Sequence, residues 1–110
     1  MQKNKLPGRK LFEMSEEEIY NYFNQFPPNL FWPTEQSFSD TFLLSGTNIK
    51  RQHIRKKSCI DYAFMVFIST VSVTLFNGFN YITLVFDRTD SKLKKIYAYK
   101  YGKYLKIENI

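Results

Sequence analysis

The sequence predicts an α+β fold in which one N-terminal helix packs on a curved antiparallel β-meander of four to five strands. Two observations carry this prediction. The stretch Val71–Phe86 is rich in β-branched and aromatic residues and is interrupted by Asn77-Gly78, and a short amphipathic segment with a capping signal precedes it. A chain of 110 residues is long enough for one hydrophobic core. We therefore expect a basic flexible arm over residues 1–13 and a single α+β domain over residues 14–110.

The composition favours a folded, basic protein. Aromatic residues make up 18% of the chain, which supplies enough buried area to argue against low-complexity disorder, and the net charge is +6. Such a charge attracts polyanions and also keeps a protein soluble. Cys59 is the only cysteine, so no intramolecular disulfide can form. The N-terminus carries basic residues without an apolar stretch behind them, so we expect a cytoplasmic protein.

The segment Ser15–Phe26 is predicted to be helical. Ser15 followed by Glu18 forms a capping box, and Pro27-Pro28 ends the segment because the residue before a proline avoids the α region. The apolar residues at helical spacing are expected to share one face: Ile19, Tyr22 or Phe23, and Phe26.

Two segments between this helix and the central strands each fit more than one kind of secondary structure. Pro27–Thr47 has too many apolar residues for a free linker, so we expect it to pack over the sheet, with a short strand or helical turn at Thr41–Leu44. Cys59–Ile68 is apolar on both faces and fits either a buried strand or the end of a helix. Its Tyr, Phe, Val and Ile residues favour a strand, which bends at Ser69-Thr70 into the next one.

The central hairpin is predicted to turn at Asn77-Gly78, because Asn and Gly tolerate the positive φ of a type I′ turn. This turn pairs Phe76 with Phe79 and Val73 with Ile82. It also places the apolar residues on one face, namely Val71, Val73, Leu75, Ile82 and Leu84.

The C-terminal segment Leu93–Ile107 is predicted either as a second hairpin or as one long strand. In the hairpin, Gly102-Lys103 forms the turn and Tyr101 pairs with Tyr104. The inner face then carries Ile96, Ala98, Leu105 and Ile107.

A single membrane span is the alternative reading of Tyr62–Phe86, which contains no charged residue and follows a basic run. Within the segment, however, Ser and Thr alternate with Val at a period of two residues. Hydrocarbon gives no reason for that alternation, whereas a sheet with one buried face does. We therefore expect no membrane partner.

The titratable residues form no catalytic or metal-binding motif. His53 lies among basic residues without an orienting partner, and a lone Cys59 excludes a multi-cysteine zinc site. Asp61 lies within an apolar run, where most such carboxylates sit at a strand end in contact with water. We expect a protein that is not an enzyme, has no cofactor and takes no small-molecule substrate.

Tyrosines and lysines alternate in the C-terminal segment, with no acidic residue between Asp90 and Glu108. Tyrosines on one sheet face stack bases and lysines neutralise phosphates, which is typical of surfaces that bind single-stranded RNA or DNA. Strand propensity and the protection of a sheet edge also account for this pattern. The candidate nucleic-acid-binding residues are Lys50, Arg51, Arg55, Lys56, Lys57, Lys94, Lys95, Tyr97, Tyr99, Lys100, Tyr101, Lys103, Tyr104 and Lys106.

A protein partner is the alternative ligand. Large aromatic residues that the predicted hairpin leaves exposed would anchor a macromolecule that this protein inhibits or scaffolds. The candidate partner-binding residues are Trp32, Phe76, Phe79 and Tyr81. The oligomeric state stays open.

Overall fold

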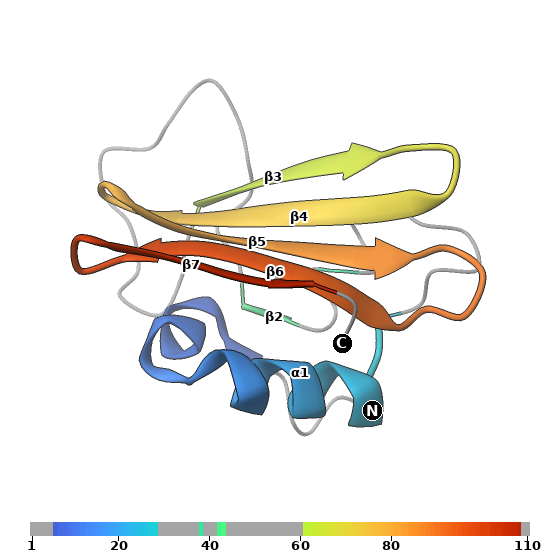
Figure 1. The fold of residues 1–110 in the computed structure, drawn as a ribbon, viewed down its shortest axis with the longest axis horizontal. Helices are drawn as coiled ribbons and strands as arrows, with labels where there is room; N and C mark the ends of the chain where they lie inside the picture. Colours follow the sequence, from blue (N-terminus) through green and yellow to red (C-terminus); the bar gives the residue numbers. More distant parts are fainter. Residues whose placement is uncertain (1–5, 29–37, 39–41, 44–60, 109–110) are drawn as a thin grey trace.

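A computed structural model describes residues 6–28, 38, 42–43 and 61–108. Its main part is a five-stranded antiparallel open sheet, covered on one face by helix α1 (Glu16–Gln25) (Figure 1). The strands follow the order of the chain: β3 (Asp61–Val66), β4 (Thr70–Asn77), β5 (Asn80–Asp87), β6 (Leu93–Lys100) and β7 (Lys103–Glu108). A second, two-stranded parallel sheet joins β1 (Leu6–Pro7) to β2 (Phe42–Leu43), and the 3-10 helix η1 (Gly8–Glu13) follows β1. The predicted α+β class is confirmed.

Helix α1 begins as the sequence predicts. The Glu18 backbone N–H donates to Ser15 Oγ at 3.1 Å, and the Ser15 N–H donates to Glu18 Oε1 at 2.8 Å, so both halves of the capping box are formed. Ile19 and Phe23 are buried. Phe26, which we expected on the same face, is half exposed because it lies at the C-cap with a non-helical φ of −128°.

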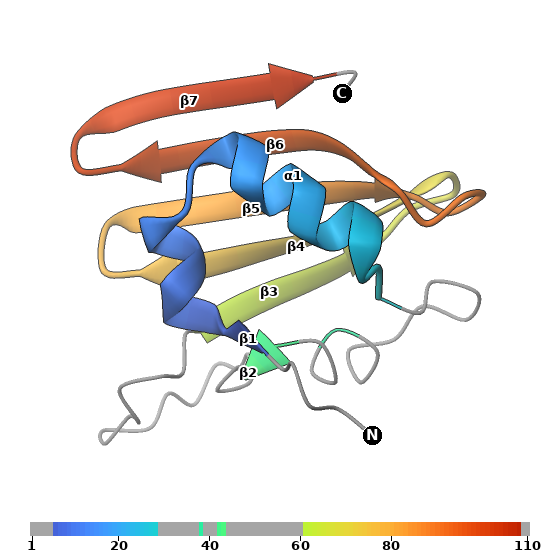
Figure 2. The ribbon, with the colours of Figure 1, turned by 90° about the horizontal axis from the view of Figure 1, so that it is seen from below.

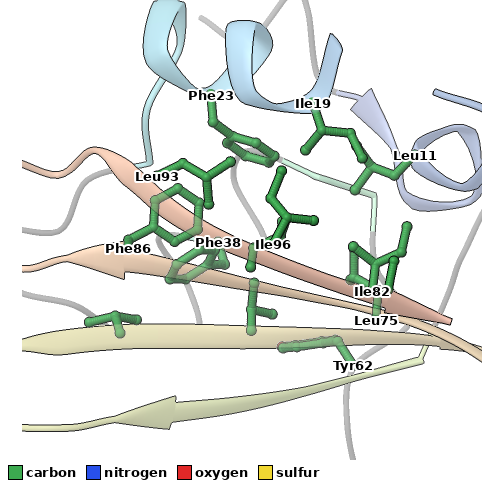
Figure 3. Packing of buried hydrophobic residues seen from close by; sticks show 14 of the residues in the cluster. Leu11, Ile19, Phe23, Phe38, Tyr62, Leu75, Ile82, Phe86, Leu93 and Ile96 are labelled. Carbon is green, nitrogen blue, oxygen red and sulfur yellow. The ribbon is translucent and has the colours of Figure 1, made fainter. Parts of the chain in front are cut away.

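The core lies between α1, η1 and the inner face of the sheet (Figures 2 and 3). Phe23 packs edge-on against Phe86, with 5.3 Å between ring centroids, and Phe38 contacts both Phe64 and Phe86. Leu11 and Phe12 are also buried in this cluster. The ordered core therefore begins within residues 1–13, where we expected a flexible arm.

The central hairpin forms, but its turn is one residue later than predicted. Asn77 pairs with Asn80, so Gly78 and Phe79 make the two-residue loop. Gly78 has φ +67° and Phe79 is not among the positive-φ residues, as in a type II′ turn. This register aligns the apolar inner residues in pairs, Val73 with Leu84 and Leu75 with Ile82. The predicted register would have placed the apolar Leu75 opposite the polar Asn80. The observed register avoids this mismatch on the buried face.

The C-terminal hairpin is confirmed, and its turn is one residue earlier than predicted. Lys100 pairs with Lys103, and Tyr101 (φ +53°) and Gly102 (φ +79°) form the loop, which two positive φ angles identify as type I′. Because both turns shift the pairing by two residues, the faces stay as predicted. Ile96 lies opposite Ile107 and Ala98 opposite Leu105.

The uncharged stretch Tyr62–Phe86 lies in β3, β4 and β5, so the strand reading holds for Asp61–Val66. In the part of the chain that the structure describes, no helix is long and apolar enough to cross a membrane. Of the long connection, Phe38 is buried and Phe42–Leu43 forms the short strand expected at Thr41–Leu44.

Candidate nucleic-acid interface

Among the residues that the structure describes, helices pack on one face of the sheet only, and we call the other face the open face. Figures 1 and 2 place α1 and η1 on the same side of the five strands, and no described helix or strand packs on the other side. Because side chains alternate along a strand, the residues between the buried positions point to the open face. The following residues of the two predicted sites are described by whether they lie on this open face.

Four aromatic residues form a continuous row across the open face. Phe76 lies opposite Tyr81, Tyr81 opposite Tyr99, and Tyr99 opposite Tyr104, so β4, β5, β6 and β7 each contribute one ring. With strands about 4.8 Å apart, this aromatic row spans roughly 15 Å. From the sequence we expect Phe76 and Tyr81 in a protein site and the other two in a nucleic-acid site, and the register brings all four together.

Two more aromatic residues occupy the turns next to the aromatic row. The Phe79 side chain is 94% exposed and that of Tyr101 is 76% exposed. The Tyr101 N–H donates to Asn80 Oδ1 at 3.0 Å, which ties the β6–β7 turn to the end of the central hairpin. Tyr101 has a left-handed φ at a position where Asn or Gly is the usual residue.

Hydroxyl groups form the next row along the strands. Thr74 lies opposite Thr83, and their Oγ1 atoms are 2.9 Å apart, while Thr83 lies opposite Tyr97. Rows of side chains on one face are two residues apart, about 7 Å along the strand. The aromatic row is thus bordered by groups that donate and accept hydrogen bonds.

The lysines of the open face lie on β6 and β7, whereas two acidic residues occupy the same face on other strands: Asp61 on β3, opposite Phe76, and Asp87 on β5, opposite Thr70. Lys106 lies opposite Tyr97, and Lys95 lies opposite Glu108. Lys106 Nζ is 3.0 Å from Glu108 Oε2, and the Tyr97 hydroxyl donates to the same oxygen at 3.5 Å. The hydrogen bond from Lys106, followed by its charge, lowers the pKa of the Glu108 carboxyl, and Glu108 in turn raises the pKa of Lys106.

Lys100 lies on the other face, although we expected it in the nucleic-acid site. Only 9% of it is exposed, its Nζ donates to the Met14 carbonyl at 3.0 Å, and Glu16 Oε2 lies 3.6 Å away. The last distance makes an ion pair without a hydrogen bond, so this carboxylate oxygen is buried without a donor. Lys103 pairs with Lys100 and so belongs to the same, inner face, where it is exposed. Lys100 joins the β6–β7 hairpin to the start of α1.

Lys94 occupies a β-bulge. Val85 pairs with Lys95 and Phe86 with Leu93, which leaves Lys94 without a cross-strand partner. Its Nζ lies 3.3 Å from Asp90 Oδ2 in the preceding turn. The bulge lets both Leu93 and Ile96 point into the core, at a spacing that regular alternation forbids.

Several predicted residues lie outside the described part of the chain. They are the basic run of Lys50, Arg51, Arg55, Lys56 and Lys57, together with Trp32, His53 and Cys59. Within residues 6–28, 38, 42–43 and 61–108, no three His, Cys, Asp or Glu side chains come together as metal ligands would.

A groove of about 530 Å³ lies along the first turns of α1, on the helical side of the sheet. Its lining is Ser15, Glu16, Glu17, Tyr20, Asn21 and Ile107. None of these residues belongs to either predicted site.

Comparison with protein-family models, with curated proteins and with solved structures finds no match.

Proposed function

We propose that this protein is a non-catalytic binding protein whose aromatic row stacks the bases of single-stranded RNA or DNA. The observation that carries the proposal is the register that aligns Phe76, Tyr81, Tyr99 and Tyr104 on an open sheet face. A planar aromatic surface accepts any base because every base has a π face, and nearby lysines attract the backbone. Lys95 and Lys106 lie on the same face, close to the hydroxyl row.

Sheet stability alone explains part of this pattern, because tyrosine is favoured in strands. It does not explain the two turns. Phe79 gains little from packing when its side chain is 94% exposed, and Tyr101 has a left-handed φ that costs about 1 kcal/mol for a residue with a side chain. Exposed aromatic rings held at such positions support a binding role for this end of the sheet.

The proposal is tested by fluorescence anisotropy with labelled single-stranded oligonucleotides at several salt concentrations. We expect the logarithm of the binding constant to fall linearly with the logarithm of the salt concentration, with a slope of about −0.7 for each phosphate neutralised. Tyr99→Leu should weaken binding, whereas Tyr20→Leu on α1 should not. Equal affinity of the wild type and Tyr99→Leu would contradict the proposal.

A protein partner is the second candidate, because Phe79 and Phe76 expose apolar rings at the same end of the sheet. Exposed aromatic residues anchor protein interfaces as well as bases. The two candidates differ in their salt response, since an apolar interface depends little on ionic strength. A partner recovered by affinity capture after nuclease treatment, and retained at high salt, would favour this second function.

A further inference from the structure

Glu108 lies at the centre of three donor groups on the open face. It ends β7 directly opposite Lys95 on β6. Its Oε2 atom lies 3.0 Å from Lys106 Nζ and accepts a hydrogen bond from the Tyr97 hydroxyl at 3.5 Å. Glu108 therefore contacts Lys106 and the Tyr97 hydroxyl, and Lys95 is its partner across the two strands.

This set of donors is of the kind that binds phosphate. Lysine side chains and tyrosine hydroxyls are among the groups that contact the oxygens of nucleic-acid backbones. The carboxylate supplies the same kind of anionic oxygen acceptor to the same donors. The hydrogen bond from Lys106 lowers the pKa of the Glu108 carboxyl, so Glu108 stays ionised at lower pH than an ordinary glutamate.

The position fits the aromatic row. Tyr97 is two residues from Tyr99 on β6, and Lys106 is two residues from Tyr104 on β7, so these two donors lie one side-chain row away, about 7 Å, while Lys95 and Glu108 lie in the row beyond. This distance is about the size of one nucleotide. A base that stacks on the aromatic row therefore brings its own phosphate close to Tyr97 and Lys106.

We infer that Lys95, Lys106 and the Tyr97 hydroxyl form a phosphate subsite that Glu108 occupies in the free protein. The inference rests on the proposed function, because the phosphate belongs to the strand whose bases stack on the aromatic row. Binding then exchanges one anion for another: the backbone phosphate displaces the carboxylate from Lys106 and from the tyrosine hydroxyl. An ion pair at an exposed position is weak enough to be displaced in this way.

The test compares Glu108→Gln with Asp90→Asn, which changes the net charge by the same amount. Asp90 pairs with Lys94 at the bulge, so it controls for the overall field of the protein. With a labelled single-stranded oligonucleotide, Glu108→Gln should bind more tightly than Asp90→Asn, because the phosphate no longer has to displace a carboxylate from Lys106. Equal affinities of the two variants would overturn the inference.

A second arm separates failure of the subsite from failure of the proposed function. Inorganic pyrophosphate is titrated into both variants while the NMR signals of Lys95 and Lys106 are followed. Shifts of these signals in Glu108→Gln but not in Asp90→Asn support the subsite. If the same variants bind no oligonucleotide, the site takes free phosphate and the proposed function fails. Oligonucleotide binding that depends on Tyr99 but not on Glu108 leaves the proposed function standing and removes the subsite.

Discussion

Tyr81 and Tyr99 lie opposite each other on β5 and β6, with their ring centroids 6.2 Å apart and their ring planes inclined by 22°. The pair forms the middle of the aromatic row, between Phe76 and Tyr104. Neighbouring rings held nearly parallel by the sheet need little ordering when a ligand binds, which favours affinity.

Tyr104, the end of the aromatic row on β7, can be replaced to test binding with little effect on the fold. Tyr104 is 55% exposed, so Tyr104→Ser should leave the fold intact and remove one stacking position. Loss of one base stack costs about 1–3 kcal/mol, which is roughly a 5- to 150-fold loss of affinity for a single-stranded oligonucleotide. Phe67→Ser is the matched control, because Phe67 is 48% exposed at the β3–β4 turn, and anisotropy should detect no change. Equal losses in both variants would remove the aromatic row from the account.

The β6–β7 turn should show opposite effects on stability and binding. Tyr101→Asn places a residue that tolerates a positive φ at φ +53°, so we expect a gain of about 1 kcal/mol in the free energy of unfolding. The same change removes an exposed ring and should weaken oligonucleotide binding. Urea unfolding and anisotropy measure the two effects. A variant that is no more stable and binds as well as the wild type would contradict both expectations.

The buried contact of Lys100 is expected to stabilise the hairpin. Lys100→Met keeps the apolar stem but leaves the Met14 carbonyl and Glu16 without the ammonium group. Leaving buried polar groups unpaired costs about 2–3 kcal/mol of the free energy of unfolding. Lys103→Met, on the exposed cross-strand partner, should change it by about 0.5 kcal/mol or less. Thermal or urea unfolding of the two variants provides the comparison, and similar small changes in both would show that the Lys100 contact contributes little.

The pair of Lys106 and Glu108 predicts a pH dependence with a definite sign. The Glu108 pKa is lowered in the folded protein, first by the hydrogen bond from Lys106, so the stability from this pair is fully present above the ordinary carboxyl value of 4.5. It is lost as the pH falls through the lowered folded value. NMR titration of the carboxyl carbon should show Lys106→Gln returning the Glu108 pKa towards 4.5. The Asp90 pKa, lowered first by the Lys92 backbone N–H, should not change, and an unaltered Glu108 pKa would contradict the pairing.

The two hairpins illustrate how far the sequence could be taken. Apolar alternation was sufficient to assign faces, because a pairing error of two residues leaves every side chain on its own face. It was not sufficient to place the turns. Both two-residue loops contain the predicted glycine, but the second loop residue differs from the prediction. It is Phe79 instead of Asn77 in the central hairpin, and Tyr101 instead of Lys103 in the C-terminal hairpin. The aromatic row depends on that register, so it could not be seen beforehand.

Two lysines show a signal that the sequence did contain. Lys100 follows Ile96 and Ala98 at a period of two, which places it on the inner face with them. Its grouping with the surface tyrosines overlooked this alternation. Lys94 and Lys95 separate Leu93 from Ile96 by three positions, a spacing that fits a strand only if it contains a bulge. The partner of Lys100 was harder to foresee, because the Met14 carbonyl is far away in the sequence.

The most direct test follows the tyrosine ring signals by NMR while an unlabelled single-stranded oligonucleotide is added. The account predicts shifts at Tyr81, Tyr99 and Tyr104, with none at Tyr62, which is buried on the inner face, or at Tyr20 on α1. Shifts at Tyr20 and Tyr62 with the aromatic row unchanged, or saturating additions that move none of these rings, would contradict the proposal that the open face binds bases.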